Sequence, residues 1–350
     1  MFKKHTLIFL LLVAGLVAAA CSNDAPDSAG TVTSDDAGSI RLGHFPNVTH
    51  ATAIVGVDNG IFKKALGDDV TLETKTFNAG PAAVEAVFSD AIDITYIGPG
   101  PATNAYAKSK GAAVRVIAGA AANGAALVVK PGITSAAQLK GKKIATPQLG
   151  NTQDIALRYW LKEQGLKTDK DGGGDVAIVP QENAQSLETF TSGAIDGAWV
   201  PEPWAYRLEQ AGGTVLVDER DLWPEKKFVT THVIVRTKFL KEHPDVVKKF
   251  LAGHVEANQQ INADPTAAQK TVAEGIGKIT SKPLKLEIAA GGWKTLVFTD
   301  DPVPNSLIEG AKHAQAVDLL EQVDNLQGIY DLGPLNEVLQ EKSLQQVSGP

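Results

Sequence analysis

The sequence predicts an α/β protein of two lobes, each built on a parallel or mixed sheet with flanking helices. Three observations support this fold class. Short apolar, β-branched segments alternate with segments of helical periodicity from residue 39 onward, the alternation restarts after Pro131, and two extended segments near 127–130 and 229–235 join the two units as a two-strand hinge. Repeated alternation of this kind is typical of mostly parallel sheets covered by helices.

The first unit has four expected strands, each followed by a glycine- or proline-containing turn or a helix. The strands are expected at 40–45, 70–77, 92–97 and 114–121. The helix over 49–59 stops at Gly60, a residue suited to a left-handed cap. Two further helices open at 78–81 and 98–101, where proline lies near the first turn, and run to about 89 and 108.

The second unit repeats this pattern before a helical carboxyl-terminal third. After a short helical turn at 136–139, strands are expected at 143–146, 176–179, 197–200 and 214–217, and helices at 152–164, 183–192 and 201–210. The segment 239–340 is almost entirely helical, with breaks at Pro244, Pro265, Pro283 and Pro304. We therefore expect one lobe from 39–127 plus 234–350 and a second lobe from 128–233.

The amino terminus is expected to direct export. Lys3 and Lys4 precede an apolar run over 7–20, which is shorter than the roughly 20 residues of a transmembrane helix. This arrangement predicts a signal peptide over 1–20. Val17-Ala-Ala-Ala-Cys21 resembles a bacterial lipobox, so Cys21 is the expected lipidation site, carrying palmitate-like chains, and the polar segment 21–38 is a flexible tether to the cell membrane. The alternative is an ordinary signal peptide with an incidental cysteine.

Composition excludes several functional classes. Among 350 residues, 33 Lys+Arg against 40 Asp+Glu give a net charge of −7, which argues against nucleic acid as a partner. The single cysteine excludes an internal disulfide and a thiolate zinc cluster. His44 and His50 lie six residues apart across a turn, so no metal site is predicted. No Gly-x-Ser-x-Gly elbow or other catalytic set is present, which predicts a protein that is no enzyme and needs no cofactor.

The strand-to-helix turns are the candidate ligand site. The first N–H groups of a helix lack internal partners and carry partial positive charge. Several helix N-termini that converge on one cleft therefore bind an anion without lysine or arginine, and glycine allows close approach of the backbone. The alternative for each single turn is that it only caps its helix. The candidate ligand-binding residues of these turns are Asn47, Asn78, Gly80, Gly98, Pro99, Gly100, Gln148, Asn151 and Thr152.

Five motifs carry a resemblance to a known family. They are Asn78-Ala-Gly-Pro81, Ile97-Gly-Pro-Gly-Pro101, Gly150-Asn-Thr-Gln153, Asp196-Gly-Ala-Trp-Val-Pro-Glu-Pro-Trp204 and Thr237-Lys-Phe-Leu-Lys-Glu-His-Pro-Asp245. In this order behind a lipobox they resemble the solute-binding lipoproteins of ABC importers, in the aliphatic-sulfonate, nitrate and taurine group with the type II periplasmic-binding-protein fold. The resemblance implies a monomer that closes two lobes on a small oxyanion and delivers it to the transmembrane subunits of an ABC permease.

Three further side chains are candidates for the remainder of the ligand. Trp199 is expected at a strand end facing the cleft, where its indole packs against an organic tail, and Phe45 is a second wall candidate. Glu202, with Asp154, could receive an ammonium group, which would favour an amino-sulfonate such as taurine. The alternative for Glu202 is a stabilising first-turn carboxylate, and Trp204 is expected to pack in the core of its own helix.

Other functions remain open at this point. A neutral ring compound such as a pyrimidine precursor, held by Trp199 and Trp204, is the main alternative ligand. A receptor module that feeds a sensor kinase and an enzyme on the same fold are the alternatives outside transport.

Overall fold

The computed structural model describes residues 38–350. The predicted signal peptide over 1–20, Cys21 and the tether up to residue 37 lie outside the described residues. The remaining chain forms one compact unit that contains two β-sheets.

The larger sheet has six strands in the order β11-β4-β10-β3-β1-β2. β1 pairs in parallel with β2 and β3, whereas β10 pairs antiparallel with both β3 and β4, so the sheet is mixed. β11 adds to the edge at β4 in antiparallel orientation. The strands are β1 (Ser39–His44), β2 (Thr71–Thr76), β3 (Ile94–Ile97), β4 (Val114–Asn123), β10 (Val229–Arg236) and β11 (Leu296–Phe298).

The smaller sheet has five strands in the order β7-β6-β8-β5-β9. β6 is parallel to β7 and β8, and β5 is antiparallel to β8 and β9, so this sheet is also mixed. The strands are β5 (Ala125–Val129), β6 (Lys143–Thr146), β7 (Ala177–Pro180), β8 (Gly197–Pro201) and β9 (Thr214–Asp218). The predicted α/β class with two parallel or mixed sheets is confirmed.

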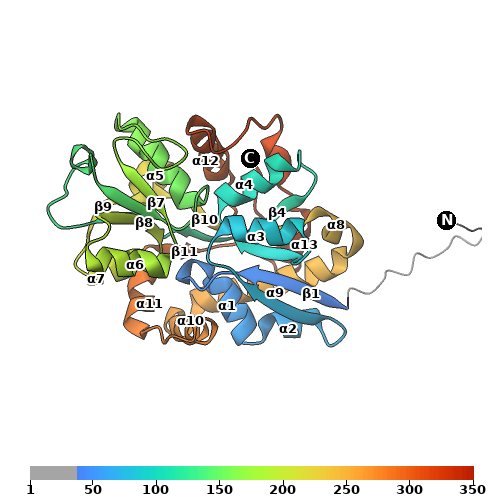
Figure 1. The fold of residues 1–350 in the computed structure, drawn as a ribbon. Helices are drawn as coiled ribbons and strands as arrows, with labels where there is room; N and C mark the ends of the chain where they lie inside the picture. Colours follow the sequence, from blue (N-terminus) through green and yellow to red (C-terminus); the bar gives the residue numbers. More distant parts are fainter. Residues whose placement is uncertain (1–37) are drawn as a thin grey trace, which may run out of the picture. The chain divides into compact units, whose positions relative to one another are not determined.

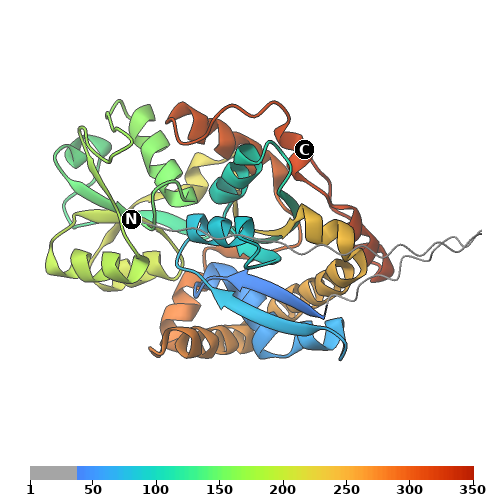
Figure 2. The ribbon, with the colours of Figure 1, turned by 45° about the vertical axis from the view of Figure 1, so that its right-hand side comes forward.

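The helices cover both faces of each sheet. They are α1 (Ala51–Asp58), α2 (Ile61–Leu66), α3 (Gly80–Phe88), α4 (Pro99–Lys108), α5 (Thr152–Glu163), α6 (Asn183–Ser192), α7 (Trp204–Gln210), α8 (Thr237–Glu242), α9 (Pro244–Ala263), α10 (Pro265–Thr280), α11 (Leu286–Trp293), α12 (Pro304–Ala316) and α13 (Gly333–Glu341). Figures 1 and 2 show α5 and α6 on opposite sides of the smaller sheet.

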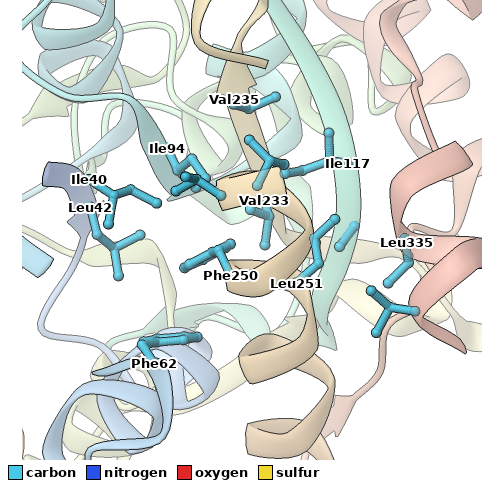
Figure 3. Packing of buried hydrophobic residues seen from close by; sticks show 14 of the residues in the cluster. Ile40, Leu42, Phe62, Ile94, Ile117, Val233, Val235, Phe250, Leu251 and Leu335 are labelled. Atoms are coloured by element: carbon cyan, nitrogen blue, oxygen red, sulfur yellow. The ribbon is translucent and has the colours of Figure 1, made fainter. Parts of the chain in front are cut away.

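The alternation of strand side chains explains these layers, because successive residues of a strand point to opposite faces. In the larger sheet, Ile94 and Tyr96 belong to a core shared with α2, α9 and α13. Ile97 and Ile234 belong to a second core shared with α3, α4 and α12. Figure 3 shows Phe250 of α9 between Ile40, Leu42 and Phe62 in the first of these cores.

The smaller sheet follows the same rule. Leu127 and Trp199 pack with α5, whereas Val128 and Val200 pack with α6 and α7.

The chain passes between the sheets at two places. Asn123 ends β4 and Ala125 begins β5, so Gly124 alone separates strands of different sheets; Asn123 and Gly124 have φ of 68° and 75°. The return runs from β9 through 219–228 to β10. The predicted lobe boundaries at 127/128 and 233/234 lie inside β5 and β10, a few residues from the points where the chain changes sheet. The boundaries of the lobes remain a prediction.

One local expectation differs from the structure. β11 lies inside the segment expected to be almost entirely helical. The three residues of β11 are all apolar although Val297 is exposed. The strand therefore lacks the alternation of apolar and polar residues that predicts a half-buried strand.

Candidate ligand-binding site

A small polar cavity lies where the N-terminal ends of several helices meet. α3, α4, α5 and α6 contribute their first residues or their caps, and the 3-10 turn over Val48–His50 before α1 contributes two more positions. The wall consists of Phe45, Asn47, His50, Asn78, Ala79, Gly80, Gly98, Pro101, Pro147, Asn151, Thr152, Gln153, Asn183, Pro201 and Thr230.

Sheet topology explains why these helix ends meet. β1, β2 and β3 are parallel neighbours in the larger sheet and lead into the turn at Val48, α3 and α4 respectively. β6 and β7 are parallel in the smaller sheet and lead into α5 and α6. Because parallel strands end at a common edge, the helices that follow them begin there, which is where open α/β sheets bind ligands.

Within residues 38–350, no lysine, arginine, aspartate or glutamate lines the wall. Its side-chain polar groups are amides, hydroxyls and one imidazole, and its other donors are backbone N–H groups of helix first turns. Such a site presents partial positive charge from helix dipoles without a formal charge.

Seven of the twelve predicted ligand residues line this cavity. They are Phe45, Asn47, Asn78, Gly80, Gly98, Asn151 and Thr152. The sequence pattern therefore brings the strand-to-helix turns of both sheets to one place.

Several of these polar groups already have protein partners. Asn151 caps α5, since its Oδ1 accepts from Asp154 N at 2.9 Å, while its Nδ2 donates to Gln153 Oε1 at 3.1 Å. Thr152 Oγ1 accepts from the backbone N–H of Gly100 at 3.3 Å. This last bond joins the first turn of α4 to that of α5, and so joins elements attached to different sheets.

Two further hydrogen bonds near the cavity also link elements that are attached to different sheets. Trp204 Nε1 donates to Asn47 Oδ1 at 2.9 Å. Asn78 Nδ2 donates to Glu182 Oε1, at the cap of α6. A groove lined by Trp204, Arg207 and Glu182, among others, adjoins the cavity and shares Asn47, Asn78 and Asn183 with it.

The other predicted ligand residues lie away from this cavity. Pro99 and Gly100 line a separate cavity, which Thr152 borders as well. Gln148 is half-buried, and its carbonyl accepts from Asn151 N. Neither Trp199 nor Glu202 lines the cavity.

Trp199 lies in the core of the smaller sheet rather than facing the cleft. Its side chain is 0% exposed and packs on the α5 side, and its Nε1 donates to Glu219 Oε2 at 2.7 Å. Burial raises the pKa of Glu219 to about 7. The period-two alternation of β8 assigns Trp199 to this face.

Glu202 is buried between α7 and the region of α11. Its Oε2 accepts from Tyr206 N at 3.1 Å, and its Oε1 lies 3.4 Å from Thr295 Oγ1. Burial raises the pKa of Glu202 to about 8. Asp154, the other carboxylate considered for an ammonium group, is fully buried and accepts from Thr146, Gly150 and Arg158.

The structure adds wall residues that the sequence analysis did not select. Asn183 is the first residue of α6, after the N-cap Glu182, and its buried Oδ1 has no hydrogen-bond partner among the described residues. His50 was considered only as a metal ligand. Thr230 and Gln153 are the other added polar residues, and both are buried.

Neither a cluster of metal ligands nor a membrane-spanning helix is found within residues 38–350. No group of three or more His, Cys, Asp or Glu residues there is arranged to hold a metal ion. No helix of that part of the chain has the length and apolar character needed to cross a membrane.

The two mixed sheets place this chain in the class of two-lobed periplasmic binding proteins. The chain belongs to the NMT1-like family, whose profile matches residues 34–277. The taurine-binding periplasmic protein of Escherichia coli (strain K12) is 31% identical over 227 residues, covering 65% of this chain and 68% of that protein. The resemblance predicted from the five motifs is confirmed.

Solved structures show the same fold. The alkanesulfonate-binding protein SsuA from Xanthomonas axonopodis pv. citri, bound to MOPS, has a TM-score of 0.69 at 17% identity and covers 84% of this chain and 98% of its own. The nitrate-binding protein NrtA from Synechocystis PCC 6803 has a TM-score of 0.71 at 17% identity, covering 87% and 89%. All three proteins are binding proteins, which supports the prediction that this chain is no enzyme.

Proposed function

We propose that this protein is the extracytoplasmic solute-binding component of an ABC importer and captures a small oxyanion of the sulfonate, taurine or nitrate class. The observation that carries the proposal is the convergence of four helix N-termini and a 3-10 turn on a cavity without a formally charged wall residue. Helix N-termini are established anion sites because their N–H groups are unpaired and their dipoles point the positive end at the ligand.

The electrostatics of the wall favour a monoanion. A carboxylate on the wall would repel it, and none is present. Small oxyanions have three or four acceptor oxygens, which match the many donors that amides, hydroxyls and backbone N–H groups offer.

Capture is proposed to occur by closure of one sheet with its helices against the other. The wall draws on turns from both sheets, so a bound anion contacts both and stabilises the closed state. The relatives that bind taurine and alkanesulfonates support this assignment.

Isothermal titration calorimetry of the purified protein tests the ligand class. Taurine, ethanesulfonate and nitrate are titrated separately, with uracil and a pyrimidine amine as neutral ring controls. We expect saturable heat with at least one oxyanion and none with the neutral rings. Binding of a neutral ring alone would contradict the proposal and favour the ring-compound alternative.

Export and anchoring complete the proposal. We propose that Cys21 carries the lipid and that the protein works as a monomer outside the cytoplasmic membrane, delivering its solute to permease subunits. Cys21→Ser is expected to abolish incorporation of a fatty-acid probe in cells. Equal labelling of the variant and the original protein would refute the anchor.

A further inference from the structure

Among the described residues that line the cavity, His50 is the only titratable one. It ends the 3-10 turn after β1 and is 3% exposed. Its ring lies 4.3 Å, centroid to centroid, from that of Phe45, with an interplanar angle of 31°. The ring is therefore held in one place by packing and is not a mobile surface histidine.

The hydrogen bonding of His50 fixes its tautomer. Nδ1 accepts from the backbone N–H of Phe45 at 3.3 Å. In a neutral imidazole one nitrogen accepts and the other carries the hydrogen, so Nε2 is the N–H donor. Among the described residues no protein group pairs with Nε2, and the ring borders the cavity.

We propose that His50 is a ligand-positioning and charge-selecting residue of this site, which donates Nε2–H to an oxygen of the bound anion. The inference rests on the proposed function and adds a side-chain donor to the backbone N–H groups already described. In this proposal, protonation of the His50 ring on ligand binding gives the site a full positive charge without a lysine or arginine.

The physical basis is a difference between the empty and the occupied cavity. Burial holds the pKa of His50 well below its usual value, so the empty site contains a neutral ring. An anion in contact with Nε2–H stabilises the imidazolium form and raises the pKa of His50 in the complex. Binding is therefore expected to take up a proton at a pH between these two values.

The groups around His50 do not replace it in this role. His44, the neighbouring histidine of β1, has a pKa lowered to about 4 by burial, and its weak repulsion lowers the pKa of His50 further. Tyr96 of β3 is buried against His254. The remaining titratable groups on elements packed against this turn are bonded elsewhere or exposed: Asp58 on α1, His232 and Arg236 on β10, Arg115 on β4 and Glu287 on α11.

Two substitutions test the contributions of the two ring nitrogens of His50 separately. In His50→Asn the amide oxygen replaces Nδ1 as acceptor for Phe45 N–H, but the ε-position donor is lost. In His50→Gln the amide NH₂ replaces Nε2–H, but the Nδ1 acceptor is lost. We expect His50→Asn to weaken oxyanion binding about tenfold or more and His50→Gln to weaken it less, although the latter disturbs the protein contact.

Calorimetry with ethanesulfonate, taurine and nitrate measures these affinities, and thermal melts of the ligand-free variants measure folding. A second readout on the unmodified protein is proton uptake, obtained by titrating in buffers of different ionisation enthalpy. Sulfonate and nitrate do not titrate in this range, so uptake reports the protein. We expect uptake at pH 6 and none near pH 8, and binding that tightens as the pH falls.

The outcomes distinguish the two proposals. If the unmodified protein binds no oxyanion, the proposed function fails and this inference fails with it. If it binds one, but His50→Asn binds equally well and no proton is taken up at pH 6, the proposed function stands and the role of His50 is overturned. Should both variants fail to fold, the proton uptake of the unmodified protein alone decides.

Discussion

Glu202 is a carboxyl group that the fold keeps largely away from water. It is 4% exposed and receives one backbone N–H and one hydroxyl contact. No lysine or arginine pairs with it among the described residues, and Glu209 and Asp218 add repulsion to the effect of burial. Burial without a charged partner favours the neutral form, which is why its pKa rises to about 8.

We expect Glu202 to make folding stability fall with rising pH. An unfolded glutamate has a pKa of 4.5, so between pH 4.5 and about 8 the folded state holds a proton that the unfolded state has lost. The contribution of the neutral carboxyl is complete below pH 4.5 and is lost as the pH approaches 8. Glu202→Gln should therefore stabilise the protein at pH 8 by about 1–3 kcal/mol and change little at pH 4.5.

Urea unfolding at the two pH values measures this effect. Glu274→Gln, at an exposed position of α10, is the matched control and should change stability little at either pH. An equal effect of Glu202→Gln at both pH values would show that folding does not raise the pKa of this carboxyl.

The residue scale also shows where sequence reasoning reaches its limit. Asn47, Asn78 and Asn151 were predicted because each follows a strand at a helix start, a pattern that the sequence carries locally. Trp199 was not placed correctly by that reasoning, because its partner Glu219 lies twenty residues further on. His50 was considered only as a metal ligand, because the cavity that it lines forms only when two sheets meet.

At the scale of elements, the first turns of α4 and α5 approach each other very closely. A Cβ at Gly98 would lie 2.3 Å from Thr152 Oγ1, well inside contact distance. Glycine at this position allows the two helix ends to share one cavity. A methyl group there must displace the Thr152 side chain, which holds Gly100 N–H.

Gly98→Ala is expected to weaken oxyanion binding about tenfold, because overpacking at this contact costs about 1–3 kcal/mol and opposes closure. Gly277→Ala is the control, since the nearest atom to its added Cβ lies at 3.6 Å. Calorimetry gives the affinities, and thermal melts without ligand show whether folding is affected. Unchanged affinity in Gly98→Ala would mean that these helix ends need not meet when the ligand binds.

Element boundaries followed the sequence closely where caps and breakers are local. The helix over 183–192 and the strand over 143–146 agree with α6 and β6 residue for residue. The edge strand β11 could not be found, because three residues at the rim of a sheet are defined by pairing with β4 and not by a pattern of their own.

At the scale of the whole molecule, contacts join the elements of the two sheets around the cavity. Trp204–Asn47, Asn78–Glu182 and Gly100–Thr152 are hydrogen bonds of this kind. On α12, His313 stacks on Tyr159 of α5 with a centroid distance of 3.7 Å. We expect the three hydrogen bonds to break when the lobes separate.

Trp204→Phe tests one of these contacts, because it removes the indole N–H and keeps an aromatic ring. Loss of one hydrogen bond of about 1 kcal/mol from the closed state should speed ligand release about fivefold. Stopped-flow dilution of a preformed ethanesulfonate or taurine complex measures the rate. Trp160→Phe, a change at the edge of the smaller sheet's core, should leave release unchanged. Equal rates in all three proteins would show that Asn47 and Trp204 do not hold the cavity shut.

The link at Gly124 sets the kind of motion that the molecule can make. A single residue between two strands leaves no loop to absorb displacement, so any rotation of one sheet against the other must be taken up by a few torsion angles there and in 219–228. In the proposed closure each sheet turns as a rigid block about this short link. Capture of a solute by such a rotation need not repack either interior, so the NMR shifts of methyl groups in the two cores should change little when the site is filled.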